Sequence, residues 1–181
     1  MKLSHFGYTL NSKFSLHFNF VKSIETTKGL KVDLDNSKLV RLKIMDFLAR
    51  REHTTKEIYQ KLEKRVESLT VLEDEINKLV EEGLIDNERF AEQYIHSRSS
   101  KGYGPLRIEH ELKQKGIEKS ISQPLMADTD WTGLAQQVLK KKAGNKLLQE
   151  TKELLKIKKF LNYRGFDFSH IEKALSLHKE S

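Results

Sequence analysis

One group of side chains that could bind a charged partner lies around a short glycine-containing segment. It reads SRSSKGYGPLRIEHELKQKGI from Ser97 to Ile117, and it joins a basic turn to an amphipathic helix that begins at Pro105. Gly102 and Gly104 could bring backbone N–H groups close to a phosphate. The segment lacks the Lys-Ser/Thr ending of a P-loop and follows a helix, so a tight connection between two helices is the alternative interpretation.

Basic side chains flank that turn on both sides. Arg98 and Lys101 precede Tyr103, while Arg107 and Lys113 lie on the helix that follows. Together they predict a basic and aromatic patch that contacts phosphate or an acidic protein surface. Tyr103 has two interpretations, as a plug at a helix junction or as a contact residue, because tyrosine combines an apolar ring with a polar end.

A second candidate surface lies closer to the C-terminus. On a helix with about 100° per residue, three lysines and a tyrosine fall on one stripe: Lys152, Lys156, Lys159 and Tyr163. Ile157 and Leu161 fall on the opposite face, so the stripe would meet solvent or a partner, and a merely solvated basic face is the alternative. Lys140, in the run Lys140–Lys142, is a further candidate, although lysines are also common at a solvated helix end.

Enzyme chemistry finds little support in the residue types. The chain has no cysteine, which excludes a disulfide framework, a thiol nucleophile and a cysteine-containing zinc site. Its seven histidines are scattered without the paired spacing of a metal site. The acidic run Glu73–Glu75, with Lys78 nearby, is interpreted as a solvated helix face with local ion pairs. We therefore expect neither catalysis nor a metal or other cofactor.

Charge is distributed unevenly along the chain. The 33 basic and 26 acidic side chains give a net charge of +7. Residues 128–181 carry +4 (11 basic, 7 acidic), residues 87–127 carry +2 (7 basic, 5 acidic) and residues 38–86 carry −1 (10 basic, 11 acidic). This favours contact with nucleic acid or a nucleoprotein through residues 87–127 and 128–181.

The apolar residues point to a cytoplasmic, soluble protein. No apolar run approaches the roughly 18 residues that a membrane span needs, and residues 1–30 lack the apolar block of a signal peptide. With only 2 Pro and 9 Gly, the chain from Leu39 onward repeats apolar residues at three- and four-residue spacings, which predicts an all-α fold. The expected helices are near 38–51, 55–65, 70–82, 87–99, 105–115, 118–127, 130–142, 150–164 and 167–178.

The first 37 residues have a different pattern. Phe14, Leu16, Phe18 and Phe20 alternate with polar residues, which is typical of a strand. One isolated strand or hairpin cannot form a core. We expect residues 1–37 to be a non-helical extension, either disordered or a short hairpin docked on the helical body.

Capping signals mark the helix ends. Thr54 with Glu57 and Thr70 with Glu73 have the spacing of a capping box. Asp86 and either Asp128 or Asp130 suit the starts of two later helices. Three helices are expected to stop at glycines followed by an apolar residue: Gly83, Gly116 and Gly165.

An internal repeat organises these helices. Three Ile-x-x-x-Leu pairs each precede a basic residue by three positions: Ile58 and Leu62 before Arg65, Ile108 and Leu112 before Lys115, and Ile157 and Leu161 before Arg164. The leucines are 50 and 49 residues apart, a period typical of stacked helical units. The alternative is a chance match among leucine-rich helices. We predict three three-helix repeats, over 38–86, 87–127 and 128–181.

These motifs resemble the RecX family of bacterial recombination regulators. The resemblance rests on the Ser97–Ile117 segment, on Ala49–His53 and Leu84–Phe90 before it, and on Asp130-Trp131 and Phe160–Phe166 after it, in the family's order over about residues 38–178. It implies three tandem three-helix repeats in an elongated, curved molecule. It also implies binding in the groove of the RecA filament on single-stranded DNA, which restrains strand exchange, ATP turnover and stimulated repressor self-cleavage in recombination, DNA repair and the SOS response.

Two functions therefore stay open from the sequence, besides an inert helical adaptor. The first is a monomeric, non-catalytic regulator that binds the RecA filament and binds single- or double-stranded DNA only weakly by itself. The second is a direct DNA-binding protein whose helical triplets act like helix-turn-helix units. Steep salt dependence of binding would favour the second.

Overall fold

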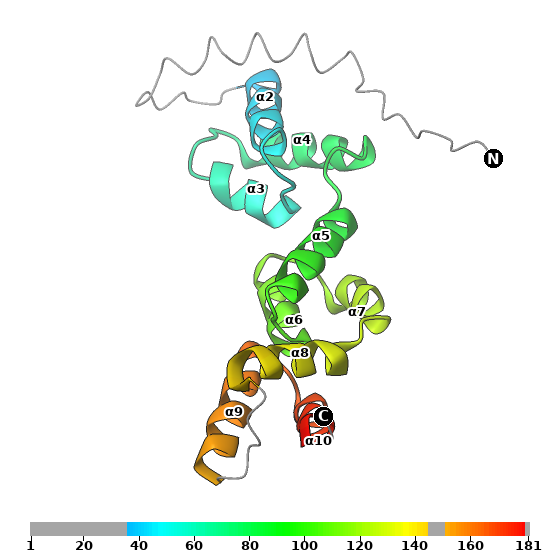
Figure 1. Cartoon of the computed structure of the whole chain (residues 1–181). Helices are drawn as coiled ribbons and strands as arrows, with labels where there is room; N and C mark the ends of the chain where they lie inside the picture. Colours follow the sequence, from blue (N-terminus) through cyan, green and yellow to red (C-terminus); the bar gives the residue numbers. More distant parts are fainter. Residues whose placement is uncertain (1–35, 145–150, 180–181) are drawn as a thin grey trace, which may run out of the picture.

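The computed structural model describes residues 36–144 and 151–179, and these residues form nine helices with no strand among them (Figure 1). The helices are α2 (Ser37–Leu48), α3 (Thr55–Leu62), α4 (Leu69–Glu81), α5 (Asn87–Ser100), α6 (Pro105–Gln114), α7 (Lys119–Ala127), α8 (Trp131–Ala143), α9 (Thr151–Arg164) and α10 (Phe168–Lys179). The predicted all-α fold is confirmed. The alternating segment Phe14–Phe20 lies outside the described residues.

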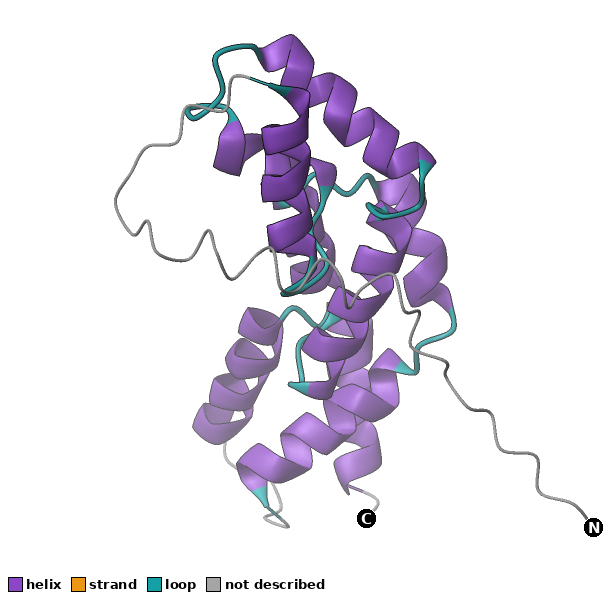
Figure 2. Ribbon diagram, turned by 90° about the horizontal axis from the view of Figure 1, so that it is seen from above, coloured by secondary structure: helices purple, strands orange, loops and turns teal. Residues whose placement is uncertain are grey.

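The helices are arranged as three tandem three-helix repeats in an elongated molecule. In Figure 1 the group α2–α4 lies at one end, α5–α7 in the middle and α8–α10 at the other end. Figure 2, turned by 90°, shows the same helices with short connections between most of them. None of the described helices combines the length and apolar character that crossing a membrane requires.

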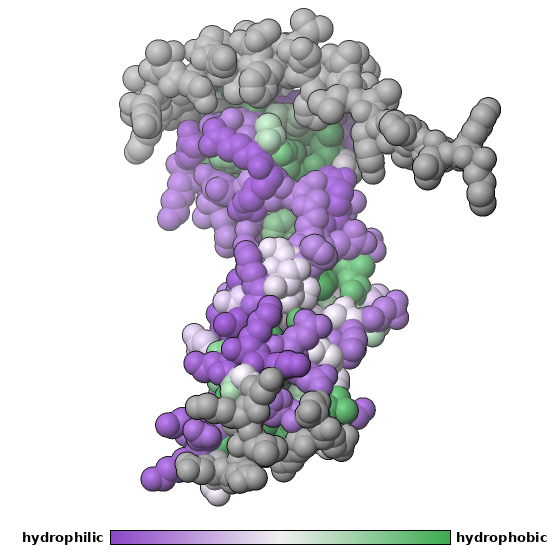
Figure 3. Space-filling model, viewed as in Figure 1, coloured by the Kyte–Doolittle hydropathy of each residue, from purple (hydrophilic) through white to green (hydrophobic). Residues whose placement is uncertain are grey.

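Each repeat buries its own small core. All six residues of the Ile-x-x-x-Leu pairs are buried, so the predicted period corresponds to the core positions of the second helix in each repeat. The second and third cores join through α8, because Trp131 packs in the core of the second repeat and Ala135 in that of the third. The face seen in Figure 3 is mainly hydrophilic, with apolar side chains in smaller patches. Small cores of this kind need their neighbours to hold them together.

Most of the expected caps are present, with one correction. Thr54 accepts from the Glu57 amide at 3.0 Å, and Asp86 and Asp130 cap α5 and α8. The cap of α4 is Ser68 and not Thr70, because the Ser68 hydroxyl accepts from the Val71 amide and the helix begins one residue after it.

The acidic run Glu73–Glu75 departs from the prediction at one residue, Glu75, although the expected ion pair with Lys78 is present. Glu73 and Asp74 are exposed, but Glu75 is buried and bonds Lys78 Nζ at 2.7 Å. Arg41 of α2 approaches the same carboxylate at 3.8 Å. Glu75 lies on the α4 face that meets α2, so it is part of the packing of the first repeat and not of a solvated face.

Candidate functional site

The glycine segment closes the junction between the second and third repeats, here called the second junction. The Gly104 amide donates to the Arg164 carbonyl at 2.8 Å, and the Leu106 amide donates to the Gly165 carbonyl at 3.0 Å. A Cβ atom on Gly104 would collide with the Gly165 backbone, and one on Gly165 would collide with Arg107. Gly165 also has φ = 92°, a conformation that favours glycine.

This geometry favours the tight-connection interpretation of the segment. Two of its amides, those of Gly104 and Leu106, already donate to carbonyl oxygens of the third repeat. These N–H groups are the ones that a phosphate at the start of α6 would need. The glycines allow one backbone to approach another, and with these two amides already bonded, an anion at this junction would depend mainly on side chains.

Tyr103 lies at the centre of the second junction between three guanidinium groups. The distances from its ring centroid to the Cζ atoms of Arg98, Arg107 and Arg164 are 4.0, 4.6 and 4.9 Å. Such cation–π contacts stabilise each pair by about 0.5–2 kcal/mol, depending on desolvation. The ring is half-buried and packs against the core of the second repeat, so Tyr103 has the position expected of a junction plug.

Glu111 of α6 neutralises two of these arginines. Its carboxylate accepts from Arg98 Nε at 2.6 Å and Arg107 Nε at 3.0 Å, and also from Arg98 Nη2 and from the Tyr94 hydroxyl at 2.9 Å. Burial opposes ionisation, but the hydrogen bonds from Arg98, Arg107 and Tyr94 outweigh it and lower the pKa of Glu111. Burial and the bond to Glu111 raise the pKa of Tyr94 to about 12.

Arg164 differs from these arginines in its partners. Its Nη1 donates to the Lys101 carbonyl at 2.8 Å, and its guanidinium lies 5.2 Å from the Phe160 ring. Its described contacts are therefore with one carbonyl group and two aromatic rings. None of these contacts is with a carboxylate that would neutralise its positive charge. Exposed lysines also lie in the last turn of α8 and along α9: Lys140, Lys141, Lys142, Lys152, Lys156 and Lys159.

The first junction, between the first and second repeats, uses the same parts of the fold. The Thr54 hydroxyl donates to the Lys115 carbonyl at 2.7 Å, and Lys115 Nζ bonds Glu57 Oε1 at 2.6 Å. Gly116 lies so close to Lys56 that a Cβ atom there would press on its side chain. The repeated bases Lys115 and Arg164 thus end equivalent helices and bind the preceding repeat.

The α9 stripe has the exposure that its spacing predicts. We call Lys152, Lys156 and Lys159 the lysine stripe, and all three are exposed. Tyr163, on the same face, is 75% exposed, while Ile157 and Leu161 are buried. Arg107 donates to the Tyr163 carbonyl at 3.3 Å and lies 5.2 Å from its ring, so the stripe ends at the second junction.

The ten candidate contact residues thus divide into groups. Five gather at the second junction: Arg98, Lys101, Tyr103, Arg107 and Tyr163. The lysine stripe continues from them along α9, whereas Lys113 and Lys140 are exposed near the ends of α6 and α8. Arg98 and Arg107 are held by Glu111, and a contact role for any of the ten stays a prediction.

Sequence reasoning left Arg164, Glu111 and Phe160 out of the candidate set. The internal repeat could have indicated Arg164, because Lys115 and Arg164 occupy the same place in successive repeats and both contact the preceding repeat. For Glu111, the sequence offered only the four-residue spacing from Arg107, which indicates a local ion pair on one helix. No described group of three or more His, Asp or Glu residues could hold a metal ion.

Comparison with known proteins places this architecture in a family. Family models described as the second and third three-helix domains of RecX match residues 86–123 and 128–175. Regulatory protein RecX from Pseudomonas entomophila is 37% identical over 145 residues, covering 79% of this chain and 94% of that protein. The protein of the same name from Halorhodospira halophila is 36% identical over 140 residues, covering 76% and 87%.

Solved structures show the same fold. A crystal structure of RecX from Lactobacillus salivarius matches with a TM-score of 0.70 and 22% identity, over 80% of this chain and 97% of that one. A second crystal structure, of a regulatory protein RecX, matches with a TM-score of 0.66 and 21% identity, over 92% of this chain and 78% of that one.

Proposed function

The chain belongs to the RecX family of regulatory proteins, and from this premise we propose that it binds the RecA filament assembled on single-stranded DNA and inhibits it. In this role the protein is a cytoplasmic monomer without catalysis of its own. It restrains strand exchange, ATP hydrolysis and the filament's stimulation of repressor self-cleavage, and so acts in recombination, DNA repair and the SOS response.

The observation that carries this proposal is the shape and charge of the second and third repeats. Three stacked repeats give an elongated molecule, as a groove-binding protein requires (Figure 1). The lysine stripe and Tyr163 are exposed on α9, where they are free to contact a nucleoprotein surface. Cations next to an exposed ring suit phosphate contact combined with stacking.

Preformed filaments provide the test. The purified protein is added to RecA filaments on single-stranded DNA, well below the recombinase concentration, and ATP hydrolysis and DNA occupancy are followed together. We expect both to fall, and a heat-denatured sample of the same protein is the control. If neither changes at any ratio, the chain is not a filament inhibitor.

Direct DNA binding is the second candidate function, and the concentration of positive charge in the third repeat favours it. Residues 128–181 carry 11 of the 33 basic side chains and 7 of the 26 acidic ones. A protein that binds DNA by itself loses affinity steeply with salt, in proportion to the phosphates it neutralises. A complex mediated mainly by recombinase contacts should show a shallower dependence, so titrations with and without recombinase distinguish the two.

A further inference from the structure

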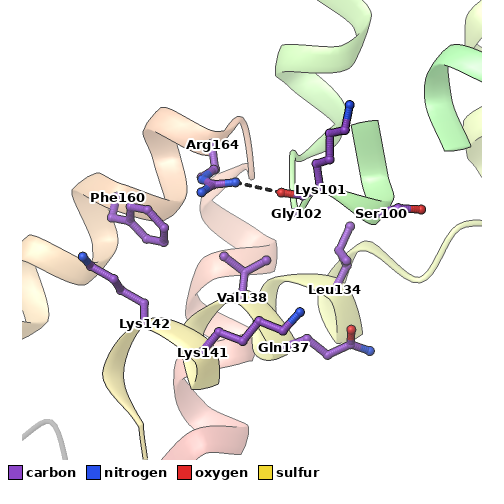
Figure 4. A pocket seen from close by; sticks show the side chains of 10 residues that line it. All are labelled: Ser100, Lys101, Gly102, Leu134, Gln137, Val138, Lys141, Lys142, Phe160 and Arg164. Atoms are coloured by element: carbon purple, nitrogen blue, oxygen red, sulfur yellow. Dashed lines mark hydrogen bonds between the residues drawn. The ribbon is translucent and has the colours of Figure 1, made fainter. Parts of the chain in front are cut away.

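A cavity of about 270 Å³ at the second junction is lined by cations from three parts of the fold (Figure 4). Lys101 follows α5, Lys141 and Lys142 belong to the last turn of α8, and Arg164 ends α9. Phe160 contributes an aromatic wall, and none of the described residues that line this junction cavity is Asp or Glu. Lys141, Lys142 and Arg164 therefore bring positive charge to a space with no acidic side chain in its described lining, while the Lys101 side chain points away from it (Figure 4).

The first junction makes the contrast clear. Its cavity, of about 390 Å³, is lined by Glu57 and Glu111 as well as by Lys115. Lys115 bonds Glu57 at 2.6 Å, so the charges there are matched within the protein. Two junctions built on one plan thus differ in their charge, and only the second leaves an excess of cations toward its cavity.

The cations of the junction cavity are partly fixed in place. Arg164 is held by its bond to the Lys101 carbonyl and by the Tyr103 ring. Lys142 Nζ lies 5.4 Å from the Phe160 ring centroid, on the side chain that Arg164 also contacts. A guanidinium has five N–H donors, so Arg164 retains donors for an oxyanion after bonding one carbonyl. Fixing the side chains beforehand lowers the entropy lost when an anion binds.

We propose that the junction cavity binds a phosphodiester group of a nucleic-acid strand. The neighbouring surface favours a strand over an acidic protein segment, because Lys152 and Lys156 are exposed and precede Phe160 and Arg164 of the lining at four-residue spacing, in one row along α9. From Lys152 to Arg164 the helix rises about 18 Å, which is enough for several successive phosphates. Tyr163, 75% exposed beside this track, offers a ring on which a base can stack. The proposal rests on the second candidate function, direct DNA binding, and deepens it by naming the site that holds the strand.

The test uses the full chain and a fluorescently labelled oligothymidylate 12-mer, with binding measured by anisotropy between 50 and 200 mM salt. The cavity variant is Lys141→Gln with Lys142→Gln. The matched control is Lys38→Gln with Lys64→Gln, two exposed lysines of the first repeat, which changes the net charge equally. If each cavity lysine neutralises one phosphate, the slope of log K against log salt falls by about 1.4 in magnitude in the cavity variant. The control should keep the parent slope.

Three results would overturn the proposal. The first is equal weakening in the cavity and control variants, which would mean unspecific attraction to the whole basic protein. The second is that the parent does not bind the 12-mer at 50 mM salt, which would refute direct DNA binding as well, whereas the first result refutes only the cavity as its site. The third is that decaglutamate loses affinity for the cavity variant while the 12-mer does not, which would assign the cavity to protein carboxylates. Circular dichroism checks that each variant is folded. If the double variant loses helical signal, Lys141→Gln alone is measured in the same titration.

Discussion

Replacing Glu111 by Gln should destabilise the second repeat by about 2–3 kcal/mol. The Glu111 carboxylate is shared by Arg98 and Arg107 and also accepts from the Tyr94 hydroxyl. Glutamine keeps one acceptor oxygen, but it removes the negative charge and turns an amide NH₂ group toward arginine donors. Two guanidinium groups would then face each other across Tyr103 without a counter-charge.

The magnitude follows from the exposure of the pair. A hydrogen bond to a charged group contributes about 1.5–3 kcal/mol to stability, and an exposed ion pair only about 0–1 kcal/mol. The side chains of Glu111 and Arg98 are 16% and 21% exposed, so solvent screens them only in part. Some of the lost bonding is recovered by the remaining oxygen and by water, which keeps the estimate well below the sum of the individual bonds.

Urea unfolding at pH 7 measures this cost. Trp131 is the only tryptophan of the chain and is buried in the core of the second repeat, so its fluorescence reports on that repeat. The matched control is Glu109→Gln on the same helix. Glu109 bonds Lys119 at 3.1 Å, and Lys119 is 66% exposed, so its loss should cost less than about 1 kcal/mol.

The pH dependence gives an independent check. Because the pKa of Glu111 is lowered on folding, its contribution is complete above the ordinary value of 4.5 and is lost as the pH falls through the lower folded value. The difference between parent and Glu111→Gln should therefore be full at pH 7 and shrink in acid below that value. A cost equal to that of Glu109→Gln, or a difference that persists undiminished in strong acid, would refute the charge-sharing role of Glu111.

Three further predictions concern the junction, the surface and the core. Gly165→Ala should cost at least about 1 kcal/mol more in urea unfolding than Gly83→Ala, because both glycines have positive φ but only the first would collide with a neighbour; equal costs would contradict this. Replacing the three lysines of the stripe by glutamate should weaken filament binding with unchanged circular dichroism, and unchanged affinity would assign the stripe to solubility. Leu161→Ala should cost about 2–5 kcal/mol, measured by thermal or urea unfolding, since it leaves a cavity in the third core.

The helices and their ends could be predicted because their signals are local. The Ile-x-x-x-Leu pairs, the glycine stops and most caps each depend on residues within one or two turns. The capping-box spacing predicts Thr70 as the cap of α4, but Ser68 performs this role, and both hydroxyl residues lie close to the helix start. The spacing predicts Glu75 on a solvated face with Lys78 as a local ion-pair partner, but the burial of its carboxylate depends on packing against α2, from which Arg41 approaches it.

The second junction could be predicted only in part. The composition of the segment around Tyr103 indicates a candidate contact site. It does not show whether Tyr103 is a junction plug or a contact residue, because that depends on which groups surround its ring. That environment includes Arg164, which is 61 positions later in the chain, and no local pattern relates the two. The assignment of Glu111 as the shared acceptor likewise depends on how α5 and α6 pack, since Arg98 and Arg107 approach it from different helices.

The two backbone bonds of the second junction make it visible to amide hydrogen exchange. The first N–H groups of a helix normally have no acceptor in the helix and exchange quickly. At the start of α6, the amides of Gly104 and Leu106 instead donate to Arg164 and Gly165 of the third repeat. Their protection therefore reports on the separation of two intact repeats rather than on the melting of either one. A ligand that bridges the repeats would slow exchange at these two positions first.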